Sequence, residues 1–303
     1  MNTTNFDLPK QNGPRVVIQG VPGAFHAVAA RQFFGVNTRL VPAATFEELV
    51  QLACLPAHAD AAIMAIENSI AGSILPNYSL LQRSQLRIVG EVLLPIRQNL
   101  LALPGVSLQD LESVHSHPMA LAQCKLFLKQ FPEIQLVESE DTAMSAAEIA
   151  QKGLRNRAAI ASTLAAELYG MAVLVPGIED DPVNFTRFLV LKPATDTQPL
   201  SGANKVSLQF GIPHQSGSLS RILTMLAAEG ANLTKIQSAP KLGKAWEYQF
   251  FIDFIHPNPA HIPATLQLLD ATTQQLQVLG VYEAGKMPET QHLNTKNTLN
   301  TTR

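Results

Sequence analysis

The sequence predicts an α/β protein in which two lobes are followed by a smaller, separate α/β domain. Short apolar runs alternate with segments of helical apolar spacing over residues 15–191, which predicts a mostly parallel α/β arrangement. Residues 193–204 are rich in Pro, Thr and Ser and have the composition of a linker. Beyond them the predicted elements follow the order βαββαβ, which is a ferredoxin-like arrangement.

Composition excludes several classes of protein. At 303 residues and 46% hydrophobic, the chain can bury a core in more than one domain. A formal net charge of -2 gives no broad basic footprint, so no nucleic-acid partner is expected. No run approaches the roughly 18 apolar residues that a membrane helix needs, so no membrane role is expected. Only two cysteines are present, and the N-terminus lacks an apolar signal core, so the cytoplasm is the expected location.

The first lobe is predicted to begin as strand, glycine turn and helix. The β-branched run at 16–18 meets Gly20 and Gly23, after which apolar residues recur at helical spacing. The third glycine of a dinucleotide fingerprint is absent, so this turn does not predict a nicotinamide or flavin site. In order, the first lobe is predicted to hold a strand at 16–18, helices at 25–34 and from Thr45, strands at 61–66 and 88–94, and a returning apolar strand at 189–191.

The second lobe is predicted between these two halves of the first. The first lobe then comprises 15–94 plus 176–192, and the second comprises 95–175. Gly170 ends one of its helices as a C-terminal glycine. In order, this lobe is predicted to hold a new apolar segment at 99–103, a helix at 120–131, a strand at 135–138, a helix at 142–151, a strand at 158–162 and a helix at 164–169, after which residues 171–175 lead back toward the first lobe.

The smaller domain is predicted at 205–285 and is followed by a disordered tail at 286–303. At the other end of the chain, residues 1–14 are predicted to form a flexible arm that precedes the first lobe. Its predicted elements are strand 205–211, helix 219–229, strand 233–238, a hairpin turn at 240–244, strand 246–254, helix 264–275 and strand 278–284.

Polar side chains at the ends of predicted strands mark a candidate site. Glu67, Asn68 and Ser69 follow the buried run 61–66, where open α/β sheets bind ligands. Thr186 and Arg187 stand in front of the apolar run 189–191. A guanidinium matches a carboxylate bidentately and a threonine hydroxyl adds a short donor, so we expect this pair to hold an acid in a cleft between the lobes.

Metal chemistry is not predicted. His115 and His117 form a His-x-His pattern, but no further group of ligands accompanies it.

Five motifs in order together resemble prephenate dehydratases that carry a C-terminal ACT domain, and the resemblance covers roughly residues 15–284. They are Gly20-Val-Pro-Gly-Ala-Phe25, Ile66-Glu-Asn-Ser-x-x-Gly-Ser73, Ser116-His-Pro118 with Gln123, Ala159-Ile-Ala-Ser162, and Asn184-x-Thr-Arg-Phe-Leu-Val-Leu191. The ACT half adds Gly217-Ser-Leu219 and Asn232-Leu-Thr-Lys-Ile236.

The resemblance implies a two-lobed catalytic domain with lobes like those of periplasmic binding proteins, and decarboxylating dehydration of prephenate to phenylpyruvate without a metal or organic cofactor. It assigns Thr186 the central catalytic role, and a protonated Glu67 or a water relay is a candidate proton source. It further implies L-phenylalanine as effector and a homodimer or homotetramer. The substrate-binding residues implied are Asn68, Ser69, Ser116, Gln123, Ser162, Arg187 and Phe188, and the effector-binding residues are Gly217, Leu219, Asn232 and Ser238.

The chain departs from the family pattern in three places. Ala24 and His26 stand where the family usually has hydroxyl residues, so side-chain donation from that turn is not expected. In the ACT half, Gln237 and Ala239 replace the usual Glu and Arg of one effector segment, and Ser218 replaces the usual Ala between Gly217 and Leu219.

Two alternative functions remain open. Arogenate dehydratase performs the same elimination on the aminated substrate, and these residues do not separate the two. A noncatalytic amino-acid sensor is the alternative of another class, and the Thr186, Arg187 and Glu67 set argues against it.

Overall fold

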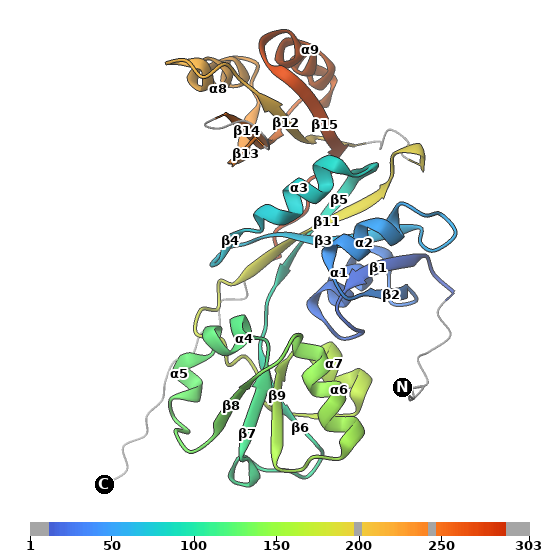
Figure 1. Ribbon diagram of the computed structural model, residues 1–303, viewed down its shortest axis with the longest axis vertical. Helices are drawn as coiled ribbons and strands as arrows, with labels where there is room; N and C mark the ends of the chain where they lie inside the picture. Colours follow the sequence, from blue (N-terminus) through green and yellow to red (C-terminus); the bar gives the residue numbers. More distant parts are fainter. Residues whose placement is uncertain (1–11, 197–201, 242–246, 289–303) are drawn as a thin grey trace.

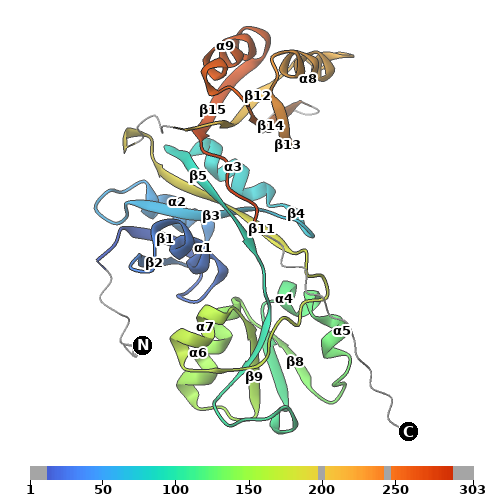
Figure 2. The ribbon, with the colours of Figure 1, turned by 180° about the vertical axis from the view of Figure 1, so that it is seen from behind.

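The computed structural model describes residues 12–196, 202–241 and 247–288. Three bodies follow one another along the longest axis of the molecule, with the first lobe in the middle, the second lobe at one end and the C-terminal domain at the other (Figures 1 and 2). The remaining parts of the predicted arm, linker, hairpin turn and tail lie outside the described residues.

Lobe one is built on six strands, of which β11 returns to it from lobe two. The sheet order is β5-β11-β3-β1-β2, with β4 paired to β3. Its strands are β1 (Arg15–Gln19), β2 (Arg39–Ala43), β3 (Ala61–Asn68), β4 (Gly72–Ser73), β5 (Leu86–Pro95) and β11 (Phe185–Pro193). Its helices are α1 (Phe25–Phe34), α2 (Phe46–Ala53) and α3 (Leu75–Arg83).

Lobe two has its own five-stranded sheet in the order β10-β6-β9-β7-β8. Its strands are β6 (Asn99–Ala102), β7 (Ser113–Ser116), β8 (Gln135–Glu138), β9 (Arg157–Ala161) and β10 (Ala172–Val175). Its helical segments are η1 (Leu108–Asp110), α4 (Pro118–Gln123), α5 (Lys125–Leu128), α6 (Thr142–Lys152) and α7 (Thr163–Tyr169).

The C-terminal domain has the predicted ferredoxin-like order of elements, with strands arranged β13-β14-β12-β15. Its described elements are β12 (Lys205–Gly211), α8 (Ser218–Ala228), β13 (Asn232–Pro240), β14 (Tyr248–Ile255), η3 (Pro259–His261), α9 (Ile262–Thr272) and β15 (Gln274–Tyr282). A short helical segment, η2 (Ala194–Asp196), follows β11 at the start of the predicted linker.

The sheets are mixed, where the alternation of elements had suggested mostly parallel pairing. β1 pairs parallel with β2 and β3, and β7 pairs parallel with β8 and β9. β11 runs antiparallel to both β3 and β5. The reason is that β5 leads the chain from lobe one into lobe two, and β11 brings it back in the opposite direction. Three elements of lobe one, β2, β4 and α3, were not predicted from the sequence.

The C-terminal domain shares a core and a sheet with lobe one. Phe251, Leu279 and Tyr282 pack in one buried cluster with lobe-one residues that include Tyr78 and Leu86. β15 meets β5 at a single parallel pair, Gly280 with Ile88, which joins the two sheets into one of ten strands. A Cβ on Gly280 would lie 2.3 Å from the Ile88 carbonyl oxygen, so only glycine permits this approach.

A buried ionic cluster crosses the same junction. The Arg187 guanidinium donates from Nε to Glu91 Oε2 at 2.6 Å and from Nη1 to Asp253 Oδ2 at 2.5 Å. Lys205 Nζ donates to Glu91 Oε1 at 2.8 Å. The side chains of Arg187 and Glu91 are only 10% and 1% exposed. Since each buried charge has an opposite partner, removal of one partner leaves an uncompensated charge away from water.

Replacing Glu91 with Gln should destabilise this junction. E91Q leaves two buried cations with less compensating charge, so we expect the free energy of unfolding to fall by about 3 kcal/mol or more. Denaturant titration of both proteins measures the difference. The matched control is Glu148→Gln, which removes an exposed ion pair with Lys152 and should change stability little. Equal stabilities of E91Q and the wild type would contradict the assigned importance of the cluster.

The contribution of Glu91 should also depend on pH. Burial alone would raise the pKa of Glu91, but the charges of Arg187 and Lys205 lower it below its ordinary value of 4.5. A carboxylate with a depressed folded-state pKa stabilises the protein above its unfolded pKa, and this stabilisation is lost as pH falls through the folded pKa. The stability difference between wild type and E91Q should therefore be constant near neutral pH and shrink only below pH 4.5. Denaturant titrations across an acid series measure it, and a difference that shrinks already near neutral pH would contradict the lowered pKa.

Candidate active site

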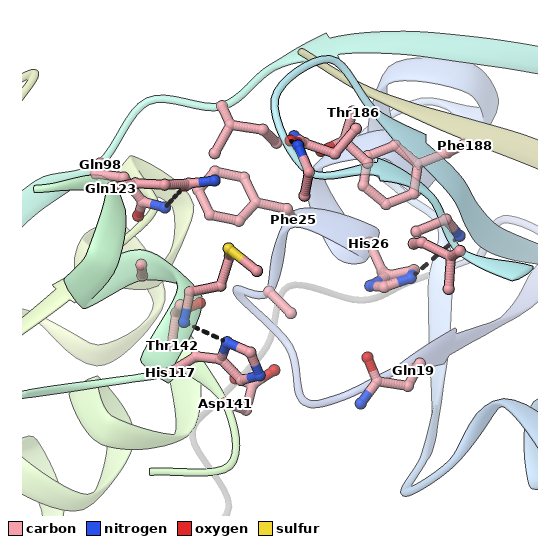
Figure 3. A pocket seen from close by; sticks show the side chains of 18 of the residues that line it. Gln19, Phe25, His26, Gln98, His117, Gln123, Asp141, Thr142, Thr186 and Phe188 are labelled. Atoms are coloured by element: carbon pink, nitrogen blue, oxygen red, sulfur yellow. Dashed lines mark hydrogen bonds between the residues drawn. The ribbon is translucent and has the colours of Figure 1, made fainter. Parts of the chain in front are cut away.

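A cavity of about 430 Å³ lies between the two lobes. Figure 3 shows side chains from both lobes facing across it, with Thr186, Phe188 and His26 on one side and Gln98, Gln123, His117 and Thr142 on the other. The lining residues used below are Gln19, Phe25, His26, Phe46, Ala65, Asn68, Ser73, Gln98, His117, Gln123, Asp141, Thr142, Thr186 and Phe188.

The pairing of β3 with β11 decides which side chains reach this cavity. Thr186 lies opposite Asn68, and Arg187 lies opposite Glu67. Because successive side chains of a strand point to opposite faces, the first pair faces one side of the sheet and the second pair faces the other. Thr186 and Asn68 line the cavity, whereas Arg187 and Glu67 do not.

The hydroxyl of Thr186 is oriented by Asn68. The Asn68 oxygen Oδ1 accepts hydrogen bonds from the backbone N–H groups of Ile70 and Ala71, at 3.0 and 2.9 Å. This fixes the amide so that its nitrogen donates to Thr186 Oγ1 at 3.1 Å. The threonine oxygen therefore acts as acceptor toward Asn68. Its own hydrogen, which has no acceptor among the described residues, is left to donate into the cavity.

A chain of amides continues from Asn68 across to lobe two. Asn68 Nδ2 donates to Asn184 Oδ1 at 2.7 Å, and Asn184 Nδ2 donates to Gln123 Oε1 at 3.1 Å. Gln98 Nε2 donates to the same Gln123 oxygen at 3.4 Å. Both acceptor bonds fall on Oε1, so Nε2 of Gln123 has no acceptor within the described ranges. Gln123 thus presents a second donor to the cavity from the opposite lobe.

Asn184 is a site residue that the sequence analysis did not single out. It is 1% exposed and connects the two lobes through its side chain. The signal was its place at the head of the motif that contains Thr186.

The prediction that Arg187 holds a substrate carboxylate is contradicted by its contacts. Its guanidinium is engaged with Glu91 and Asp253 behind the sheet, and Nη2 donates to the Tyr282 hydroxyl at 3.0 Å. Despite burial, which alone would lower it, the pKa of Arg187 is raised well above its ordinary value by the charge of Asp253. Arg187 is therefore a fixed cation of the domain junction.

The prediction that Glu67 supplies a proton is contradicted in the same way. Its carboxylate accepts a hydrogen bond from Lys235 Nζ of β13 at 2.6 Å, and Lys235 also donates to Ser73 Oγ at 2.6 Å. Glu67 thus ties the C-terminal domain to the end of β3 and does not face the substrate.

Three serines expected to bind substrate have local structural partners instead and do not line the cavity. Ser69 Oγ donates to the Val183 carbonyl and accepts from the Phe185 N–H. Ser116 is fully buried and donates to the Ile160 carbonyl at 2.7 Å. Ser162 caps α7 and donates to the Gly23 carbonyl at 2.6 Å, which holds lobe two against the glycine turn of lobe one.

Gly20 of that turn makes a second close contact between the lobes. It has φ of +90°, and a Cβ there would lie 2.5 Å from the Asp141 carboxylate. Asp141 caps α6 by accepting from the N–H groups of Ala143 and Met144, and burial raises the pKa of its carboxyl. Glycine at this position therefore lets the capped end of α6 approach the wall of the cavity.

The cavity has no cationic side chain: among its lining residues there is no lysine or arginine. Burial also keeps His26 neutral by lowering its pKa to about 3. An anion in this cavity would be held by neutral donors such as Thr186 and Gln123.

A second cavity of about 380 Å³ lies on the C-terminal domain, between the start of α8 and β14. Gly217 and Leu219, two of the four predicted effector contacts, line it together with Phe250. Asn232 and Ser238 do not line it, because both lie on β13, an edge strand where they are exposed.

Among the residues that the structure describes, no group of three or more His, Cys, Asp or Glu side chains is placed to hold a metal ion. None of the helices in the described ranges is long and apolar enough to cross a membrane.

Family models match both the two-lobed part and the C-terminal domain. Residues 16–196 match the family model described as prephenate dehydratase, and residues 206–272 match that of the ACT domain. The first match covers more than half of the chain. The chain belongs to the prephenate dehydratase family. The C-terminal domain is its ACT domain.

Curated relatives of this prephenate dehydratase family member carry two kinds of name. The chain is 36% identical over 277 residues to the bifunctional chorismate mutase/prephenate dehydratase of Aquifex aeolicus, with 91% of this chain and 75% of that protein covered. It is 39% identical over 292 residues to arogenate dehydratase 1 of Petunia hybrida, with 90% and 68% covered.

Solved structures agree with the fold. The prephenate dehydratase of Arthrobacter aurescens in complex with L-Phe superposes with a TM-score of 0.78 at 30% identity, covering 89% of this chain and 90% of that one. GqqA, described as a novel type of quorum quenching acylase, gives a TM-score of 0.80 at 33% identity, covering 89% and 98%.

Proposed function

We propose that this protein converts prephenate to phenylpyruvate, carbon dioxide and water in L-phenylalanine biosynthesis, with Thr186 as the catalytic donor. The observation that carries the proposal is the Thr186 hydroxyl, whose oxygen accepts from Asn68 and whose hydrogen is left for a ligand in the cavity. The family membership supports the reaction class.

In the reaction, the bond between the ring carbon and its carboxylate breaks, and the electron pair enters the ring. The opposite carbon–oxygen bond breaks as the ring becomes aromatic, and the leaving oxygen departs with the negative charge. Thr186 donates a hydrogen bond to that oxygen as charge develops on it, which stabilises the transition state more than the substrate. Because Glu67 is held by Lys235 on the other face of the sheet, the proton that completes the water comes from solvent in the cavity.

Neutral donors suit the decarboxylation half of this reaction. The carboxylate that leaves loses its charge on the way to the transition state. A cation against it would stabilise the substrate more than the transition state and raise the barrier. The cavity instead offers amide and hydroxyl donors, and the fixed cation Arg187 lies behind the sheet.

Removing the Thr186 hydroxyl should remove turnover. Thr186→Val keeps the shape but loses the donor, so we expect kcat to fall by about 100-fold or more with little change in KM. Phenylpyruvate formation from prephenate measures both. Thr186→Ser should retain much of the activity, and Thr272→Val on the ACT helix α9 is the control for the same change elsewhere. If T186V keeps kcat within a fewfold of wild type, Thr186 is not the donor.

The same assay separates the alternative functions. Arogenate offered in place of prephenate tests the arogenate dehydratase reading, which the relative from Petunia hybrida keeps open. A protein that turns over neither substrate but binds an amino acid would be a sensor, and the proposal would be wrong.

We also propose that L-phenylalanine binds the cavity on the ACT domain. Its support is the lining by Gly217, Leu219 and Phe250, and the similarity to the Arthrobacter aurescens structure that contains L-Phe. We further propose a homodimer or homotetramer, a cytoplasmic location, and a catalytic domain at 15–192 followed by an ACT domain at 205–285. The exposed edge strand β13 offers a surface for pairing between subunits.

Shortening Leu219 should weaken this effector. Leu219→Ala removes apolar surface from the cavity, so we expect about tenfold weaker binding of L-phenylalanine, with turnover in its absence unchanged. Isothermal titration calorimetry measures the affinity. Leu268→Ala, at an exposed position of α9, is the matched control. Unchanged affinity in L219A would place the effector elsewhere.

A further inference from the structure

His26 presents a hydrogen-bond donor of fixed direction to the cavity. It is the second residue of α1, is 9% exposed, and lines the cavity between the lobes. Its ring packs edge-on against Phe188, with centroids 5.0 Å apart at 80°, and lies 5.6 Å from the ring of Phe46. Contact with two aromatic rings holds the imidazole in one orientation.

The tautomer of His26 follows from its contact with β3. The backbone N–H of Ala65 donates to Nε2 at 3.3 Å, so Nε2 must carry a lone pair. Burial lowers the pKa of the ring to about 3, which keeps the imidazole neutral at neutral pH. Its one proton is therefore on Nδ1. Within the described parts of the chain, Nδ1–H has no acceptor. In Figure 3 the bond to β3 lies on one side of the ring, and the other nitrogen lies on the side that faces lobe two across the cavity.

The position of this donor relative to Thr186 suits a six-membered ring. Phe188 follows Thr186 by two residues on the same face of β11, which places it about 7 Å farther along the strand. His26 packs against Phe188 and lies on the same side of the cavity as Thr186 (Figure 3). The step of about 7 Å from Thr186 to Phe188 is comparable with the span between groups on opposite carbons of the substrate ring. With the leaving hydroxyl at Thr186, the pyruvyl side chain on the opposite carbon lies toward His26.

A neutral histidine tied in this way is more selective than a hydroxyl. A serine or threonine hydroxyl can turn to donate or to accept. His26 can only donate, because its acceptor nitrogen is occupied by Ala65. A ketone oxygen accepts such a bond, whereas an ammonium group in the same place brings a second donor and leaves both unpaired.

We infer that His26 donates from Nδ1–H to the side-chain ketone oxygen of prephenate, and so favours the keto acid over its aminated counterpart, arogenate. This inference rests on the proposed function, and it makes His26 a specificity-determining residue. It concerns the choice of substrate and not the elimination step, which depends on Thr186.

Two substitutions test the roles of the two ring nitrogens of His26 independently. Asn places its amide near the position of Nδ1, and Gln reaches the position of Nε2. His26→Asn therefore keeps a donor toward the cavity, while His26→Gln keeps an acceptor for the Ala65 N–H and loses that donor. We expect H26Q to lower kcat/KM for prephenate by about tenfold or more, mainly through KM, with a smaller loss for arogenate. H26N should keep the preference of the wild type.

The measured quantity is the ratio of kcat/KM for prephenate to that for arogenate. If arogenate is not turned over, its inhibition constant against prephenate supplies the comparison. His26→Ser should narrow the ratio, and His58→Gln at an exposed position should leave it unchanged. Thermal denaturation shows whether each variant is folded. If H26Q does not fold, H26S alone tests the loss of the Nδ1 donor.

The outcomes distinguish the two proposals. A wild-type protein that does not turn over prephenate defeats the proposed function. A wild type that turns it over, with equal losses on both substrates in H26Q and H26S, overturns the role of His26 alone. The role of His26 is supported if the ratio of kcat/KM for prephenate to that for arogenate falls in H26Q and H26S and is unchanged in H26N.

Discussion

The alternation of side chains along β3 and β11 is the constraint on which the rest of this structure depends. At the end where the two strands meet the cavity, Thr186 and Asn68 face the interlobe space, and their neighbours Arg187 and Glu67 face the ACT domain. One pair of strands therefore supplies the Thr186 hydroxyl to the cavity on one face and the ionic contacts of the domain junction on the other. A shift of register by one residue would exchange the two faces, with the Arg187 guanidinium in the cavity and the Thr186 hydroxyl on the side of Asp253.

This arrangement places two residues that contact the ACT domain next in the chain to residues that line the cavity. Asp253 of β14 holds Arg187, and Lys235 of β13 holds Glu67. The cluster is buried and each charge is paired, so it resists separation of the ACT domain from lobe one. A movement of β13 or β14 relative to lobe one has to act on these ion pairs, and the residues adjacent to them are the ones that position the Thr186 hydroxyl. Each of the two residues held by the ACT domain is therefore bonded directly to a residue that lines the cavity: Arg187 follows Thr186, and Asn68 follows Glu67.

Sequence reasoning located the site better than it oriented its residues. Thr186, Asn68, Gln123 and Phe188 line the cavity, and the motifs that contain them were recognisable from residue order. The motifs predict Arg187 and Glu67 in the cleft because these residues are next to Thr186 and Asn68 in the sequence. This prediction is wrong because successive side chains of a strand point to opposite faces of the sheet. β2 was missed because its five residues include Pro42 and one exposed arginine, as an edge strand tolerates. The tautomer of His26 could not be predicted from the sequence, because it depends on the N–H of Ala65 in β3, which is distant from His26 along the chain.

The separation of charges explains why the cavity for a dianion is lined by no lysine or arginine. Cations are abundant around this sheet, but Arg187, Lys205 and Lys235 are each paired with a carboxylate on the side of the ACT domain. The oriented donors of the cavity are a hydroxyl, an amide and a neutral imidazole, and their directions are set by partners behind them: Asn68 sets Thr186, Asn184 sets Gln123, and Ala65 sets His26. Fixed neutral donors recognise oxygens by position without stabilising the carboxylate that has to leave. Specificity and turnover then depend on the same property, which is that each donor is already oriented before the substrate enters.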